Sequence, residues 1–169
     1  MPQTYREDGT VRSGDSVLLK SVLTEGWLVT DMGDRITTHD EAYAVTTTKQ
    51  AIGACARSVM QLVKTAADGQ DDMIRFGDEL RIQSNAFICN KTLYLSSQPI
   101  SPLAFARFSR NQEVCLHSRA TYNTVWRILP IEGNRKARMG LPVSAGEQVA
   151  FEHAATHQAL SSEPILYRN

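Results

Sequence analysis

A six-residue phrase occurs three times in this chain, beginning at Gly14, Gly77 and Gly146. Each copy has glycine, an acidic residue and any residue, followed by apolar residues at alternate positions. Glycine adopts the positive φ of a tight turn without a Cβ clash, and the alternation predicts a strand with one buried face. The copies start 63 and 69 residues apart, so we expect one turn-and-strand unit to be repeated three times.

Two further features recur in the same order within the units. Leu28, Leu95 and Leu160 follow their glycines by 14, 18 and 14 residues. Residues 58–63 match residues 124–129, and each of these phrases precedes the next glycine by a similar distance. We therefore interpret one unit as a Gly-acid strand, a strand centred on the leucine, an irregular stretch and a closing strand.

Short strands are predicted along most of the chain, and no stretch favours a helix longer than about two turns. The expected strands are residues 16–20, 26–30, 35–38, 43–48, 59–64, 79–83, 92–96, 105–108, 113–117 and 124–129, and residues 132–139 are expected to form a polar loop. Three four-stranded units around a pseudo-threefold axis make a β-trefoil. The predicted fold is therefore all-β, a β-trefoil of three Gly-acid strand repeats with an incomplete third repeat. A β-propeller is the alternative, but its blades number four or more.

The three glycines also set the predicted boundaries. Residues 1–13 are expected to form an N-terminal tail, and residues 14–169 a single β-trefoil-like domain with repeats 14–76, 77–145 and a truncated 146–169. Loop insertions are expected at 51–58 and 98–104, because the units are longer than a compact trefoil requires. The third unit lacks a closing strand, and an open apolar seam would forfeit on the order of 10 kcal/mol. We expect further residues or a partner to complete it.

Charge and composition argue against several classes of partner. The 18 Lys and Arg residues balance the 18 Asp and Glu residues, so no net field favours nucleic acid or an anionic membrane. No apolar run approaches the roughly 18 residues of a membrane span, and the N-terminus has no signal-peptide core. Three widely spaced cysteines indicate reduced thiols and a cytoplasmic location.

Motifs for catalysis are poor in this sequence. Nucleophile-elbow, dinucleotide-binding and phosphate-loop motifs do not occur. Cys115 and His117 are expected to face one side of a strand, but a catalytic pair also needs a third, orienting group. His153 and His157 have metal-ligand spacing only on a helix, whereas the local pattern predicts a strand and a turn. We expect no enzymatic activity, no metal and no cofactor, and interpret His153 as a hydrogen-bonded turn residue.

Equivalent residues in the three units have structural interpretations. Asp15, Asp78 and Glu147 follow the three glycines and are expected to accept backbone N–H bonds within their turns. A symmetric ligand site built from these acids is the alternative. Met60 and Trp126 occupy equivalent positions as well, and we expect both to pack in the core.

Several phrases together carry a resemblance to a known family. Residues 122–129 (Tyr-Asn-Thr-Val-Trp-Arg-Ile-Leu), 140–143 (Gly-Leu-Pro-Val) and 149–153 (Val-Ala-Phe-Glu-His), with Thr156 and 159–160, resemble a MIR-like β-trefoil. More closely, they are similar to the cilia- and flagella-associated protein 161 family, as are residues 14–19 and 95–99. The resemblance covers most of the chain from Gly14 onward. Family members usually have a longer segment before the first Gly-Asp and complete the third unit.

This resemblance implies a structural role without catalytic residues. It implies a microtubule inner protein of the cytoplasmic cytoskeleton, bound in the lumen of doublet microtubules in the axoneme of cilia and flagella. Its expected partners are tubulin and neighbouring inner proteins of this large assembly, with no contact to nucleic acid or membrane.

Two equivalent loops carry opposite charge. Asp68, Asp71 and Asp72 precede the second glycine, whereas Arg135, Lys136 and Arg138 precede the third. Because tubulin is acidic, we predict that the three basic residues bind a partner. Solvated loop tips are the alternative interpretation.

A β-trefoil ligand- or carbohydrate-binding module is the alternative function. Such a site requires an exposed aromatic ring beside polar groups. Two sets of residues meet this description: Tyr122 with Asn123, and Trp27 with Asp31 and Asp34.

Overall fold

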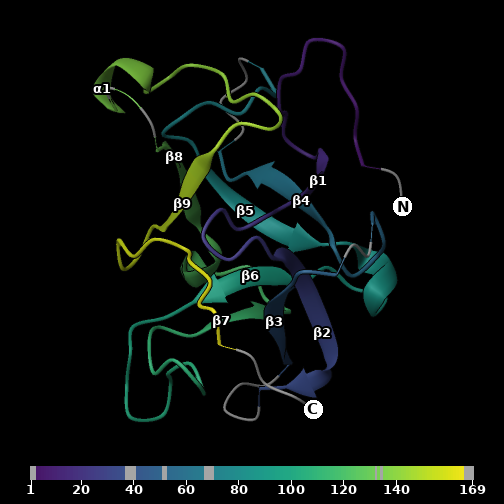
Figure 1. Ribbon diagram of the computed structural model, residues 1–169, viewed down its shortest axis with the longest axis vertical. Helices are drawn as coiled ribbons and strands as arrows, with labels where there is room; N and C mark the ends of the chain where they lie inside the picture. Colours follow the sequence, from purple (N-terminus) through teal and green to yellow (C-terminus); the bar gives the residue numbers. More distant parts are fainter. Residues whose placement is uncertain are drawn as a thin grey trace.

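The computed structural model describes residues 3–36, 41–50, 53–66, 71–131, 133 and 135–165. Within these residues, nine strands form one curled antiparallel sheet (Figure 1). The strands are β1 Ser16–Leu18, β2 Trp27–Arg35, β3 Ala42–Thr48, β4 Val59–Lys64, β5 Glu79–Ser84, β6 Tyr94–Ser97, β7 Val114–His117, β8 Trp126–Pro130 and β9 Val149–His153. Short helices are η1 Ala86–Ile88, η2 Tyr122–Thr124 and α1 Arg135–Arg138.

The strands fall into the two groups that a β-trefoil requires. Strands β1, β4, β5, β8 and β9 pair in this order and form the wall of a barrel. The hairpins β2–β3 and β6–β7 pair with each other through β3 and β7, and they cap the barrel at the lower end of Figure 1. The predicted all-β trefoil architecture is confirmed.

The third unit follows the plan of the first unit for as far as the structure describes it. After β9 the chain turns back, and the Leu160 N–H donates to the Phe151 carbonyl at 2.8 Å. The equivalent bond in the first unit runs from Leu28 to Leu19, also at 2.8 Å. The recurring leucines therefore mark the second strand position of their units, as the repeat predicts.

The three Gly-acid turns meet on the pseudo-threefold axis through a closed ring of backbone hydrogen bonds. Val11 donates to Val143, Val143 donates to Ile74, and Ile74 donates to Val11, each at 2.9 Å. All three side chains are buried. Because each residue is both donor and acceptor, the ring holds the turns in equivalent orientations. We call Val11, Ile74 and Val143 the axial ring.

Residues three and five positions after each glycine face the barrel interior. On β5, which has strand neighbours on both sides, Leu80 and Ile82 are fully buried. Val17 on β1 and Val149 on β9 are only partly buried against the same core, because among the described residues each of these strands pairs with a single barrel strand. Met60 and Trp126 are both fully buried, which confirms their predicted packing role.

The residues that precede the first glycine lie along the open side of β1. The Thr4 N–H donates to the Ser16 carbonyl at 2.9 Å. In the second unit, the equivalent bond to the Glu79 carbonyl comes from Thr65, at 3.0 Å. The segment around Thr4 thus has the place beside β1 that the end of β4 has beside β5.

Three local predictions are wrong. Residues 105–108 lie in a turn-rich loop and not in a strand, because they have no strand beside them and Arg110 turns the chain with a φ of 64°. No separate strand begins at residue 35, because β2 continues to Arg35 across an irregularity that begins at Asp31, and residues 37 and 38 of the predicted strand lie outside the described residues. The expected loop 132–139 contains the single helical turn α1, whose Arg-Lys-Ala-Arg sequence has high helix propensity.

Candidate functional site

The three acids of the Gly-acid turns share one hydrogen-bonding role. Each carboxylate accepts the backbone N–H of the residue three positions earlier, which closes the turn. The bonds are Arg12 N to Asp15 Oδ2 at 2.8 Å, Arg75 N to Asp78 Oδ2 at 2.9 Å and Ser144 N to Glu147 Oε2 at 3.1 Å. The predicted structural role of these acids is confirmed.

Each turn acid also has a basic partner. Arg6 contacts Asp15 at 2.7 Å, Lys64 contacts Asp78 at 3.1 Å, and Arg138 contacts Glu147. Burial raises the pKa of Asp15, but hydrogen bonds from the Arg6 side chain and the Arg12 backbone outweigh it, so its pKa lies below the ordinary value. Each carboxylate is therefore hydrogen bonded within its own turn and paired with its own basic residue, and the three acids do not form a common ligand site.

The predicted partner-binding residues lie on α1 and differ in how they are held. Arg138 is half-buried, contacts Glu147, and lies over the Phe76 ring at 4.9 Å. Arg135 is exposed, and its Nε donates to the Pro130 carbonyl at 3.2 Å. Lys136 is exposed beside it. Of the three residues, Arg135 and Lys136 are therefore the exposed ones, whereas Arg138 is held against Glu147 and Phe76.

The acidic loop of the first unit is paired internally. Asp71 contacts Arg75 at 2.9 Å, and Asp72 contacts Arg12 at 3.2 Å. Asp68 lies outside the described residues. The two loops are therefore paired differently in the folded chain. Asp71 and Asp72 of the acidic loop contact arginines, and Arg138 of the basic loop contacts Glu147.

A polar pocket of about 140 Å³ lies between β6, β7 and η2. It is lined by Ser96, Ser97, Gln98, Glu113, Cys115, His117, Thr121 and Asn123. As predicted from the alternation, Cys115 and His117 line the same face of β7. Burial, and to a smaller extent the charge of Glu113, raises the pKa of Cys115 to about 12. The thiol stays protonated at neutral pH, which does not suit a nucleophile.

His153 is buried at the end of β9, and both of its ring nitrogens have partners. Nε2 contacts the Asn123 carbonyl at 3.0 Å, and Nδ1 contacts Thr156 Oγ1 at 2.9 Å. Its ring lies 5.0 Å from the Trp126 ring. The predicted hydrogen bonding of His153 is confirmed, but the residue ends strand β9 and does not lie in the turn that follows. His157 is exposed beside Glu152, and in the described parts of the chain no cluster of three His, Cys, Asp or Glu side chains is placed to hold a metal.

The two aromatic sets differ in accessibility. Tyr122 is 61% exposed, and its neighbour Asn123 lines the polar pocket. Trp27 is half-buried, with the Lys20 ammonium 5.4 Å from its ring centroid, and Asp31 accepts the Gly33 N–H within its own turn. Only the Tyr122 set therefore offers an open ring beside polar groups.

Comparisons with known proteins bear on the fold. No protein-family model matches the chain. The structure is similar to that of an SDF2-like protein from Arabidopsis thaliana, at 15% identity and a TM-score of 0.74, over 94% of this chain and 81% of that one. It is also similar to a Caenorhabditis elegans protein with unknown function, at 16% identity and a TM-score of 0.71, over 95% and 83%. At these identities the likeness supports the MIR-like β-trefoil fold and nothing further. Of the helices in the described ranges, none has the length and apolar character needed to cross a membrane.

Proposed function

We propose that this chain is a non-enzymatic structural component of the ciliary or flagellar axoneme. In this proposal it is a microtubule inner protein, bound in the lumen of doublet microtubules through tubulin and neighbouring inner proteins. The proposal rests on the resemblance to the cilia- and flagella-associated protein 161 family.

The observation that carries the proposal is that the family-like phrases pack against one another. Residues 122–129 form η2 and β8, and residues 149–153 form β9, which pairs with β8 along its length. Trp126 from the first phrase contacts His153 from the second, and Thr156 is hydrogen bonded to that histidine. Val143, from residues 140–143, belongs to the axial ring. Short phrases that assemble into one packed unit support common descent better than scattered matches do.

The basic residues of α1 are the proposed contact to acidic tubulin. Arg138 is paired with Glu147, so reversing the charge of Arg138 would disturb the third Gly-acid turn. A clean test therefore uses the double variant Arg135→Glu with Lys136→Glu and leaves Arg138 in place. Lys49→Glu is the matched control, because Lys49 is an exposed lysine at the end of β3.

The experiment expresses the tagged chain in a ciliated cell and follows its retention in axonemes after detergent and then salt extraction. We expect the wild type and Lys49→Glu to stay with the doublets and the double variant to be released at lower salt, because charge contacts are screened. Release of the wild type by detergent alone would refute the axonemal role. Equal retention of wild type and double variant would refute the contact through α1 and leave the role standing.

A second candidate function is the binding of a small polyhydroxyl ligand. The observation in its favour is the polar pocket. Asn123 lines this pocket, and the adjacent residue Tyr122 is exposed. Sugars are commonly held by amide and hydroxyl groups beside an aromatic ring. A glycan array tests this proposal with the wild type and Tyr122→Ala. Specific binding that the variant loses would support it, and no binding by the wild type would refute it.

A further inference from the structure

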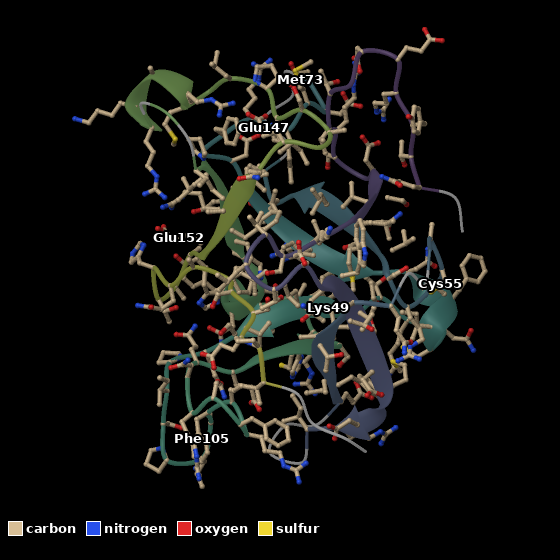
Figure 2. All side chains as sticks on the ribbon, in the orientation of Figure 1. Lys49, Cys55, Met73, Phe105, Glu147 and Glu152 are labelled. Atoms are coloured by element: carbon tan, nitrogen blue, oxygen red, sulfur yellow. The ribbon has the colours of Figure 1, made fainter. Side chains whose placement is uncertain are left out.

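The loop that joins β6 to β7 exposes a group of large apolar side chains. Ile100 is 59% exposed, Leu103 80% and Phe108 48%. The loop projects from the cap at the lower left of Figure 1, and Figure 2 shows Phe105 within it, away from the barrel strands. We call residues 98–112 the cap loop. Large apolar side chains gathered on one exposed loop are unusual on a globular protein and favour an interaction site.

The exposed charged side chains of the cap loop are basic. Between residues 98 and 112 the sequence contains Arg107 and Arg110 but no Asp or Glu, and Glu113, the last residue before β7, lines the polar pocket. Both arginines are exposed, and neither forms an ion pair within the described residues. The Glu163 carboxylate contacts the loop through the Asn111 side chain and not through either arginine. The loop therefore combines an apolar surface with unpaired positive charge.

The two arginines are also held in place by aromatic rings. The Arg110 guanidinium lies 4.8 Å from the centroid of Phe105, and that of Arg107 lies 5.4 Å from the centroid of Phe108. A guanidinium stacked on a ring keeps its N–H edge available for a carboxylate and loses less rotational freedom when it binds one.

The backbone of the cap loop is ordered by its own hydrogen bonds. Ser101 and Ala104 exchange two backbone bonds of 3.0 and 3.1 Å, and Ala104 is buried. Further along, Ala106 donates to Asn111 at 2.8 Å, and Arg110 donates to Ala106 at 2.9 Å. The exposed side chains are thus presented from a preformed turn, which lowers the entropy lost on binding.

We propose that the cap loop is a docking site for an amphipathic helix of a partner protein, whose apolar stripe is bordered by carboxylates. In this arrangement Ile100 and Leu103 pack on the stripe, and Arg107 and Arg110 form bidentate bonds with carboxylates at its edge. The inference goes beyond the axonemal proposal, because it concerns a different surface from α1 and does not depend on which assembly holds the chain. A lipid surface is the competing occupant, but two positive charges on a single loop give only weak attraction to anionic lipid.

The test measures binding of the full chain to a labelled helical peptide of glutamate with leucine at every third or fourth position. Its controls are a peptide with lysine in place of glutamate and phosphatidylserine vesicles. One variant combines Ile100→Ser with Leu103→Ser, and another combines Arg107→Gln with Arg110→Gln. The matched control is Val22→Ser with Leu23→Ser, which removes apolar side chains of similar exposure, 63% and 77%, from another loop.

We expect the wild type to bind the acidic peptide, and each cap-loop variant to bind at least about tenfold more weakly with an unchanged unfolding temperature. The Val22 and Leu23 control should bind as the wild type does. Equal binding by the cap-loop variants, no binding by the wild type, or equal binding of the lysine peptide would each overturn the proposal. Vesicle binding that the cap-loop variants lose, without peptide binding, would overturn it in favour of a lipid surface.

Discussion

Replacement of Asp15 gives the most direct test of how the Gly-acid turns are held. The Asp15 side chain is buried, and one of its oxygens accepts the Arg12 N–H at 2.8 Å. A hydrogen bond to a charged group contributes about 1.5–3 kcal/mol. Asp15→Ala should therefore lower the free energy of unfolding by about 2 kcal/mol from this bond alone, or roughly 4–8 °C in Tm for a domain of this size.

Asp15→Asn is the matched control, because its amide oxygen still accepts the same N–H. We expect it to be destabilised less than Asp15→Ala, because it keeps the bond to the Arg12 N–H and loses only the charge that Arg6 contacts. Urea unfolding followed by the fluorescence of buried Trp126 measures both variants, provided that the slope of the transition is unchanged. The reasoning fails if Asp15→Ala lies within about 0.5 kcal/mol of the wild type, or if the two variants are equally destabilised.

The pH dependence supplies a second arm of the same experiment. The folded chain holds the pKa of Asp15 below its ordinary value, so the stabilisation is present above the unfolded pKa near 3.9 and is lost as pH falls through the lower folded pKa. The difference in free energy of unfolding between the wild type and Asp15→Ala should therefore be largest above about pH 4 and become small in stronger acid. A gap that stays constant in stronger acid would contradict this account.

Three other substitutions test separate parts of the core. Trp126→Phe keeps a ring but leaves the buried Leu95 carbonyl without the N–H now 2.8 Å away, and urea unfolding should show a loss of about 1–3 kcal/mol. Gly26→Ala places a Cβ about 2.7 Å from Thr47 Cβ, so calorimetry should show a lower Tm, by the equivalent of about 1–3 kcal/mol of overpacking. Burial lowers the pKa of His153. The stabilisation that neutral His153 gives the fold is therefore fully present above about pH 6.5 and is lost as pH falls below that value. The free energy of unfolding, measured at several pH values, should fall less steeply in acid for His153→Gln than for the wild type.

Features with a local sequence signal were predicted well. The Gly-acid phrase locates all three turns, because glycine φ and acid-to-backbone bonding are properties of a few adjacent residues. The hydrophobic alternation likewise places Leu80 and Ile82 in the core and Cys115 and His117 on one face.

Features made by contacts between distant residues were not predictable in the same way. No pattern indicates that Arg6 reaches Asp15 or that Thr4 occupies the position beside β1 equivalent to that of Thr65 beside β5. The charge of Arg138 looks available in the sequence, and it becomes occupied only when folding brings Glu147 to it. The β-type composition of residues 105–108 suggested a strand, but a strand forms only where a neighbour can pair with it. The absence of Asp and Glu from residues 98–112 is the sequence feature that could have indicated the cap loop.

The axial ring also has a consequence for how the chain is made. Val11 can complete its backbone bonds only when Val143 is present, roughly 130 residues later. At ribosomal rates, that interval is on the order of ten seconds. During this time the first two turns can form locally but cannot reach their final arrangement. The nascent chain must therefore wait with part of its barrel interior exposed, and chaperone contact during synthesis should be concentrated in that interval.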